Sequence, residues 1–221
     1  MSNLLFILNF HGLGRPPHEL PSGERRYWIE PSFFEAILNS IRGRNDIQLT
    51  FDDSNESDHE IALPALQARN MTAKFFVVVQ RVDQRGYLSV SHLQSLVSAG
   101  MTIGSHGMQH RPWAGLSPQD LHEELVGARN RLEQMMGMPI SDAACPFGSY
   151  NRRVLHALEK SGYNRIYTSD GGPAFAGSWI QPRNTVLRAD DLTQIERIVS
   201  EVPHGLRRMW RRIKLTLKRW R

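Results

Sequence analysis

Cysteine is almost missing from this sequence of 221 residues, in which Cys145 stands alone. A single cysteine excludes an internal disulfide and cannot by itself form a thiolate metal site, and it fits a reducing compartment. Apolar runs of the roughly 20 residues that a transmembrane helix needs are missing too. With 40% hydrophobic and 22% charged residues, the composition is typical of a globular protein. The length allows one sizeable domain with a buried core.

An export signal is not evident either. The apolar run "LLFILNFHGLG" at residues 4–14 lacks a basic leader, is interrupted by Asn9 and is too short for a signal peptide. We therefore expect a buried strand that ends at His11, in a protein of the cytoplasm.

Basic residues are unevenly distributed. The segment 206–221, "LRRMWRRIKLTLKRWR", holds eight of the 27 Lys and Arg residues and no acid, which leaves 19 basic against 22 acidic residues elsewhere. Its apolar residues follow the spacing of one helix face. A basic amphipathic helix suits an acidic partner or an anionic membrane surface, where the protein would be peripheral. A helix docked on the domain is the alternative. Nucleic acid is disfavoured, because no base-reading pattern accompanies the segment.

Short apolar runs alternate with longer helical patterns along the chain. The predicted strands are 4–10, 47–51, 74–79, 102–104, 142–145, 165–168 and 185–187. The predicted helices are 31–42, 57–70, 91–99, 117–137, 150–162 and 190–200. In the clearest helix, Ser117 is the expected N-cap and Gly137 the expected stop. The alternation indicates parallel strands, and seven of them in a chain of 221 residues predict a closed or nearly closed α/β barrel.

Chemically useful side chains follow the predicted strands, at the edge where barrel enzymes place their sites. "LTFDDSNESD" puts Asp52 and Asp53 directly after a strand, although a turn or a helix N-cap would explain two such residues as well. "SHGMQHRPW" supplies His106 and His110, a pair that nine histidines can also produce by chance. Two imidazoles with one carboxylate form a known catalytic zinc set.

Three motifs carry a resemblance to a known family. "TFDDS", "SHGMQH" and "ACPFGSYN", in this order and at these separations, resemble the motifs of the polysaccharide deacetylases, also called the NodB-homology or carbohydrate esterase 4 family. The likeness covers roughly residues 4–190. It implies a distorted (β/α)7-type barrel in a catalytic domain of residues 1–200, followed by the basic tail of residues 201–221. It also implies a metal-dependent enzyme that removes the acetyl group from an acetamido sugar.

The resemblance implies a role for each matching residue. Asp52 would be the general base, and a divalent metal, Zn²⁺ first of all, would be held by Asp53, His106 and His110. Pro146 and Phe147 would form one wall of the substrate groove. The backbone N–H of Phe147 would help to hold the oxyanion.

The sequence departs from the family pattern at several positions. The first motif usually ends in glycine, but Ser54 stands there, which puts the conformation of this loop in doubt. Many members carry an arginine where this chain has Ala144, and that arginine steadies the base. "ACPFG" instead resembles a branch with A-x-P-Y/F-G, which includes exopolysaccharide deacetylases. In that branch "QPRNTV" would offer Arg183 in the same role, whereas pairing of Arg183 with a surface carboxylate is equally compatible with the sequence.

The last family element is an apolar strand that ends in a histidine, the general acid for the departing amine. His204 follows a predicted helix, so it does not fit this pattern. The run "LLFILNFH" does fit, since the first and last strands of a closed barrel are neighbours. This resembles a circularly permuted branch of the family, with His11 as the general acid. The alternative is a histidine at a strand end that only hydrogen-bonds to the groove wall.

These inferences predict a carbohydrate N-deacetylase in surface polysaccharide biosynthesis, acting on a polymer or on a lipid- or nucleotide-linked precursor. Two alternatives remain open. One is a non-catalytic descendant that binds glycan or protein, although such a module has no need of a base. The other is an amidase that acts on a small amide or imide.

Overall fold

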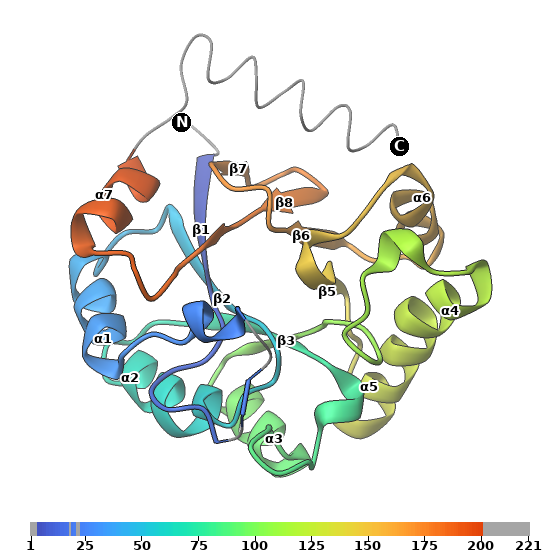
Figure 1. Ribbon diagram of the computed structural model, residues 1–221, viewed down its shortest axis with the longest axis horizontal. Coiled ribbons are helices and arrows are strands. Elements are labelled where there is room, and N and C mark those ends of the chain that lie inside the picture. The colour runs from blue at the N-terminus through green and yellow to red at the C-terminus, as the bar shows by residue number, and fades with distance from the viewer. Residues whose placement is uncertain (1–3, 18, 21–22, 201–221) are drawn as a thin grey trace, which may run out of the picture.

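A computed structural model describes residues 4–17, 19–20 and 23–200. Its backbone forms one α/β fold in which the strands lie inside a layer of helices (Figure 1). The first six strands are parallel to one another, namely β1 (Leu4–Phe10), β2 (Ile47–Phe51), β3 (Ala73–Val77), β4 (Thr102–Ser105), β5 (Asp142–Ala144) and β6 (Arg165–Thr168). Three short strands follow, namely β7 (Ala174–Phe175), β8 (Ile180–Pro182) and β9 (Asn184–Thr185).

The sheet curls into a nearly closed barrel. Strands β1 to β6 pair in chain order and in parallel. Strand β8 pairs with β6, and β9, which follows it after a single residue, pairs with β1. The segment 180–185 therefore joins β6 to β1 and closes the ring. Strand β7 is antiparallel to β1. The α/β barrel is confirmed, but the closing strand covers 180–185 instead of the predicted 185–187.

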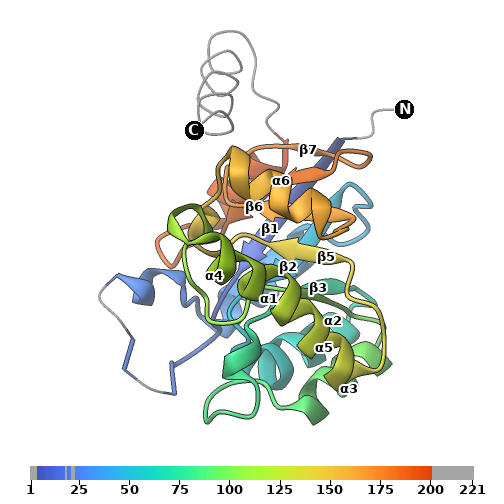
Figure 2. The ribbon, with the colours of Figure 1, turned by 90° about the vertical axis from the view of Figure 1, so that its right-hand side faces the viewer.

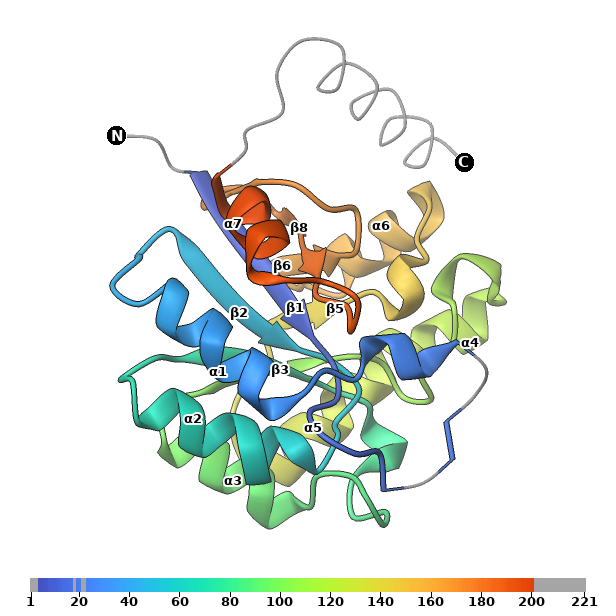
Figure 3. The same ribbon diagram turned by 60° about the vertical axis from the view of Figure 1, so that its left-hand side comes forward.

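Helices cover the outside of this barrel. Figure 3 shows α1 (Pro31–Ser40), α2 (Leu63–Gln67), α3 (Val90–Ser98) and α7 (Leu192–Ser200) along one side. Figure 2 shows α4 (Pro118–His122), α5 (Ala128–Met136) and α6 (Arg152–Lys160) along another. All helices of the described part of the chain are too short or too polar to traverse a bilayer.

Alternation along β1 places its side chains in two separate apolar regions. Phe6, Leu8 and Phe10 belong to the large core between sheet and helices, where Phe10 packs edge-on against Phe34 of α1. Ile7 instead packs with Phe76, Tyr167 and other residues inside the barrel. Because successive side chains of a strand point to opposite faces, Asn9 shares the inner face with Ile7. The barrel therefore holds a polar group at its centre.

The predicted helix 117–137 is interrupted. Ser117 caps its start by accepting a hydrogen bond from the N–H of Asp120, and Gly137 ends it with a φ of 64°. Between α4 and α5, residues Glu123–Gly127 form a π-helical turn. A second π-helical turn, Asp58–Ala62, precedes α2 within the predicted helix 57–70. Such bulges are frequent at functional sites, and both lie close to the strand-end motifs. The predicted tail, 201–221, and His204 lie outside the described residues.

Candidate active site

A cavity of about 280 Å³ opens where the barrel strands end. Six of the predicted site residues line it, namely His11, Asp52, Asp53, His106, His110 and Phe147. They follow four different strands, β1, β2, β4 and β5. The parallel barrel brings these strand ends to one edge, as the sequence predicts.

Asp53, His106 and His110 form a compact group of possible metal ligands. One ligand atom from each lies within 4.8 Å of the others. Oδ1 of Asp53 is 3.0 Å from Nε2 of His110 and 3.7 Å from Nε2 of His106. Nη1 of Arg81 also lies 3.3 Å from this buried oxygen. None of these contacts is a hydrogen bond among the described residues, so the oxygen can still bind a cation. Two imidazoles and one carboxylate fit a zinc-type site that keeps open positions for water and substrate.

The loop after β2 turns sharply to present Asp53. Asp53 and Ser54 have φ values of 79° and 63°, in the left-handed region that favours glycine. Ser54 adopts the conformation nonetheless, since its buried hydroxyl accepts a hydrogen bond of 2.8 Å from the N–H of Val78. The serine thus preserves the loop at a position where the family usually has glycine.

The two histidines are oriented by different partners. Nδ1 of His106 lies 2.9 Å from the carbonyl oxygen of Ala144, a contact that places the proton on Nδ1 and leaves the Nε2 lone pair facing Asp53. His110 has a φ of 58°, and its Nδ1 lies 3.4 Å from the guanidinium of Arg81. Arg81 also donates a hydrogen bond of 3.1 Å to the carbonyl oxygen of Asp53.

A residue that the sequence interpretation overlooked holds the histidine loop. Glu124, in the π-helical turn, is 1% exposed and accepts hydrogen bonds from the N–H groups of Met108 and Gln109, 3.0 Å each. It also accepts one from the indole of Trp113. The buried carboxylate therefore fixes the backbone between the two imidazoles. The sequence does offer an indication of this role, because Glu124 is an acidic residue on the apolar face of the predicted helix 117–137, where a buried carboxylate needs hydrogen-bond donors.

Asp52 forms a buried ion pair with Arg183. The two guanidinium nitrogens Nη1 and Nη2 each lie 2.7 Å from a carboxylate oxygen, and Arg183 is 0% exposed. Such a two-pronged contact fixes the plane of the carboxylate. The structure thus pairs Arg183 with Asp52 instead of with a surface carboxylate.

Asn9 completes this network and is a second residue that the sequence interpretation did not single out. Its Nδ2 donates to Oδ2 of Asp52 at 3.0 Å, and its Oδ1 accepts from Arg183 at 2.8 Å. The hydroxyl of Thr50 donates to the same Oδ1 at 2.7 Å. A fully buried asparagine within an apolar strand was the available signal, because a buried amide needs partners.

The network keeps Asp52 ionised. Burial raises the pKa of Asp52, but the charge of Arg183 and the neighbouring His106 outweigh it and bring this pKa down to about 2. Burial also lowers the pKa of His106, to about 4. At neutral pH the site therefore presents a carboxylate and a neutral imidazole, which are the forms needed for a base and for a metal ligand.

His11 reaches the same cavity from the end of β1. Its ring stacks on Tyr27, with centroids 4.8 Å apart, and its Nδ1 is buried without a hydrogen-bond partner among the described residues. Tyr27 therefore fixes the plane of the ring, and one ring nitrogen remains unsatisfied.

Phe147 forms the exposed rim of the cavity. It belongs to the turn Pro146–Gly148 after β5, has a φ of 55° and is 61% exposed. The centroid of its ring lies 4.4 Å from that of His110, while the preceding Pro146 is buried. An exposed aromatic ring beside the ligand group is suited to contact a sugar.

Asp58 is a buried acid close to the site, and its removal should change how the stability of the protein depends on pH. Burial and the charges of Asp53 and Asp52 raise the pKa of Asp58 well above 3.8, and its Oδ1 has no hydrogen-bond partner among the described residues. Because the unfolded chain releases this proton at a lower pH, the contribution of Asp58 to the free energy of unfolding falls as the pH rises above about 4. Each unit of pKa elevation corresponds to about 1.4 kcal/mol.

Asp58→Asn is therefore expected to gain stability relative to the wild type as the pH rises from 4 towards 8. Urea unfolding of both proteins across this range measures the difference in free energy. A difference that stays constant with pH would contradict the prediction.

Residues 40–166 match the sequence profile of the polysaccharide deacetylase family. The chain is 27% identical over 128 residues to YxkH of Bacillus subtilis, a protein assigned by its name to the polysaccharide deacetylases. The match covers 58% of this chain and 46% of YxkH, so the chain spans less than half the length of this relative.

Solved structures show the same fold. A Streptococcus pyogenes deacetylase, PplD, in complex with acetate superimposes with a TM-score of 0.80 at 18% identity, covering 91% of this chain and all of PplD. The polysaccharide deacetylase BC0361 from Bacillus cereus gives a TM-score of 0.77 at 22% identity, covering 87% of this chain and 68% of BC0361.

Proposed function

This chain belongs to the polysaccharide deacetylase family, and from that premise we propose that it hydrolyses the N-acetyl group of an amino sugar with the help of a bound divalent metal, Zn²⁺ first of all. One observation carries the proposal. The open ligand group of Asp53, His106 and His110 lies beside an ionised Asp52 that Arg183 and Asn9 hold in place.

Asp53, His106 and His110 would hold the ion, which would supply Lewis-acid polarisation of the acetyl carbonyl and a lower pKa for water. Asp52 takes the proton of the water whose oxygen attacks the acetyl carbon. Arg183 keeps this base ionised and in one orientation. The N–H of Phe147 stabilises the negative charge that develops on the carbonyl oxygen.

Cleavage of the carbon–nitrogen bond then needs a proton on the departing nitrogen. His11 is the group proposed to donate it, since it lines the cavity from the strand next to Asp52. The products are acetate and the free amine. In this assignment β1 carries the acid that the family has on its last strand, and its place between β2 and β9 supports the circular permutation.

The proposed substrate is an N-acetylated sugar in a surface polysaccharide or its precursor. An exposed Phe147 on the cavity rim supports a sugar ring as the ligand. The proposed setting is the cytoplasmic face of a membrane, to which the basic residues of 206–221 would bind the enzyme.

Acetate release tests this function. The full chain, loaded with Zn²⁺, is incubated with N-acetylglucosamine oligomers, and acetate and free amine are both quantified. We expect the two in equal amounts, their loss after dialysis against a chelator, and their recovery when Zn²⁺ returns. Acetate production that continues unchanged in the chelated sample would contradict the metal dependence. Sugar binding without any acetate would favour a non-catalytic protein.

A further inference from the structure

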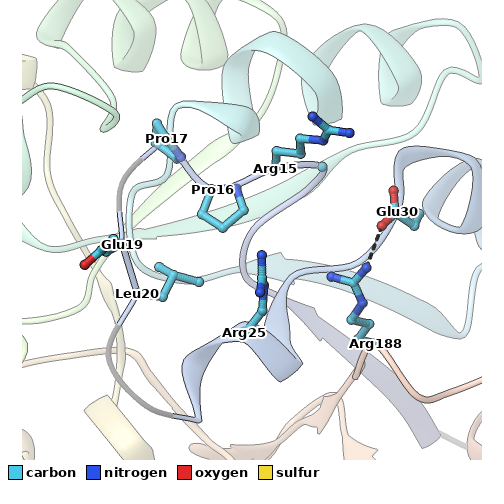
Figure 4. A pocket seen from close by; sticks show the side chains of 9 residues that line it. Arg15, Pro16, Pro17, Glu19, Leu20, Arg25, Glu30 and Arg188 are labelled. Atoms are coloured by element: carbon cyan, nitrogen blue, oxygen red, sulfur yellow. Dashed lines mark hydrogen bonds and ion pairs between the residues drawn. The ribbon is translucent and has the colours of Figure 1, made fainter.

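A second cavity adjoins the segment between β1 and α1. It has a volume of about 880 Å³, and its charged lining residues are Arg15, Arg25, Arg188, Glu19 and Glu30. Figure 4 shows Arg25 extending into the space between Leu20 and Glu30. The cavity is therefore larger than the candidate active site and is lined by three guanidinium groups.

A single helical turn separates the two cavities. The 3-10 helix Glu24–Tyr27 contributes Glu24, Arg26 and Tyr27 to the active-site cavity and Arg25 to the second one. A helix with its side chains is only about 10 Å wide. The two cavities therefore lie on either side of this turn.

The base of this segment is firmly tied to the barrel. The N–H of Ile29 donates to the carbonyl of Gly12, and the N–H of Gly14 donates to that of Ile29. A Cβ atom at Gly12 would lie 2.1 Å from the ring of Trp28, so the two arms of the segment pack closely just beyond His11. The N–H of Arg188 donates to the carbonyl of Arg26 at 2.8 Å. These contacts fix the two ends of the segment, residues 12–14 and 26–29, beside the active-site cavity.

The charges in the second cavity are not balanced. Arg188 pairs with Glu30 at 3.0 Å (Figure 4). Neither Arg15 nor Arg25 forms an ion pair with an acidic side chain among the described residues, whereas Glu19 is the one further acid in the lining. A planar guanidinium binds phosphate oxygens through two parallel hydrogen bonds. The cavity thus offers at least one uncommitted guanidinium to an anion.

We propose that this second cavity binds the diphosphate group of a substrate whose acetamido sugar occupies the active-site cavity. This inference rests on the proposed function and specifies its substrate class as a diphosphate-linked amino sugar. The active-site cavity and the arginines of the second cavity lie on opposite sides of the turn Glu24–Tyr27, which lines both cavities. A neutral N-acetylated polymer would present no anion to these arginines.

Calorimetric titration with inorganic pyrophosphate tests the cavity without requiring turnover. The full chain is used after removal of metal. We expect one binding site, and a dissociation constant at least 10-fold higher in Arg25→Gln. The matched control is Arg42→Gln, which removes an equal charge from an exposed position after α1 and should bind like the wild type. Circular dichroism of each variant verifies folding.

Absence of pyrophosphate binding, or equal weakening in both variants, would overturn the proposal. A second outcome would also overturn it. If an oligosaccharide of uronic acids binds in an Arg25-dependent way and pyrophosphate does not, the cavity recognises the carboxylates of a polymer. Acetate release from the uncharged oligomers, accompanied by no pyrophosphate binding, would remove this proposal and leave the proposed function standing.

Two further probes distinguish the sources of the diphosphate. Uridine diphosphate should bind more tightly than inorganic pyrophosphate if the substrate is linked to a nucleotide. Farnesyl diphosphate should do so if the substrate is linked to a lipid. Either result, lost in Arg25→Gln, supports the diphosphate site.

Discussion

His110→Ala is expected to reduce acetate release to the level of the metal-free sample and to lower the affinity for Zn²⁺ by more than 100-fold. His110 contributes one of three ligand atoms that lie within 4.8 Å of one another. Loss of an outer hydrogen-bond partner of a metal ligand typically costs roughly 10–100-fold in affinity, so loss of a ligand should cost more. Competition with a chelating dye measures the affinity, and the acetate assay measures turnover.

His156→Ala is the matched control, because His156 is exposed on α6. This variant should retain both Zn²⁺ and activity. A His110→Ala protein that keeps wild-type turnover would exclude the proposed ligand set. The same two measurements on Asp53→Ala should give the same loss, since Asp53 supplies the carboxylate of the group.

Arg183→Met is expected to destabilise the protein by about 3–5 kcal/mol, because it leaves the carboxylate of Asp52 buried without its charge partner. Arg183 is 0% exposed and contacts both oxygens of Asp52 at 2.7 Å. It also donates to Asn9, so the variant removes a partner of a second buried polar group. The free energy of urea-induced unfolding measures this effect.

Arg111→Met provides a control with an exposed pair. Arg111 lies 3.1 Å from Asp120, with 40% and 46% of the two side chains exposed, and such pairs contribute only about 0–1 kcal/mol. Combining Arg183→Met with Asp52→Asn removes the uncompensated charge, so the double variant should be more stable than Arg183→Met alone. An Arg183→Met protein within about 0.5 kcal/mol of the wild type, a change typical of surface sites, would contradict the buried-pair argument.

Most of the fold was predictable because its elements are encoded locally. The period of the apolar residues located six of the seven strands and all the predicted helical regions. Ser117 and Gly137 indicated two helix ends, because serine favours the N-cap and glycine the left-handed conformation of a C-cap. The closing strand was misplaced, because residues 180–185 form two short pairings with different neighbours. Strands this short contain too few residues to show the alternation of apolar and polar side chains that identifies a strand.

The convergence of the candidate metal ligands was predictable for a related reason, while the family resemblance supplied their identity. Asp53, His106 and His110 each lie beside the end of a parallel strand, and parallel strands place these ends at one edge. By contrast, Glu124 belongs to the π-helical turn that follows the histidine loop, and its carboxylate reaches back to the N–H groups of Met108 and Gln109, 16 and 15 residues earlier. Nothing in the local pattern indicates which backbone groups a buried carboxylate will satisfy.

The sequence by itself determined the order of strands and helices, the family motifs and the candidate metal ligands, because each depends on residues that are adjacent or on a regular period. Only the tertiary structure decided that Arg183 and Asn9 hold Asp52, across separations of 131 and 43 residues. It also decided that residues 180–185 bring β6 and β1 together. These contacts depend on how the sheet curls until its first and last strands meet, a property of the whole barrel that no short stretch of sequence records.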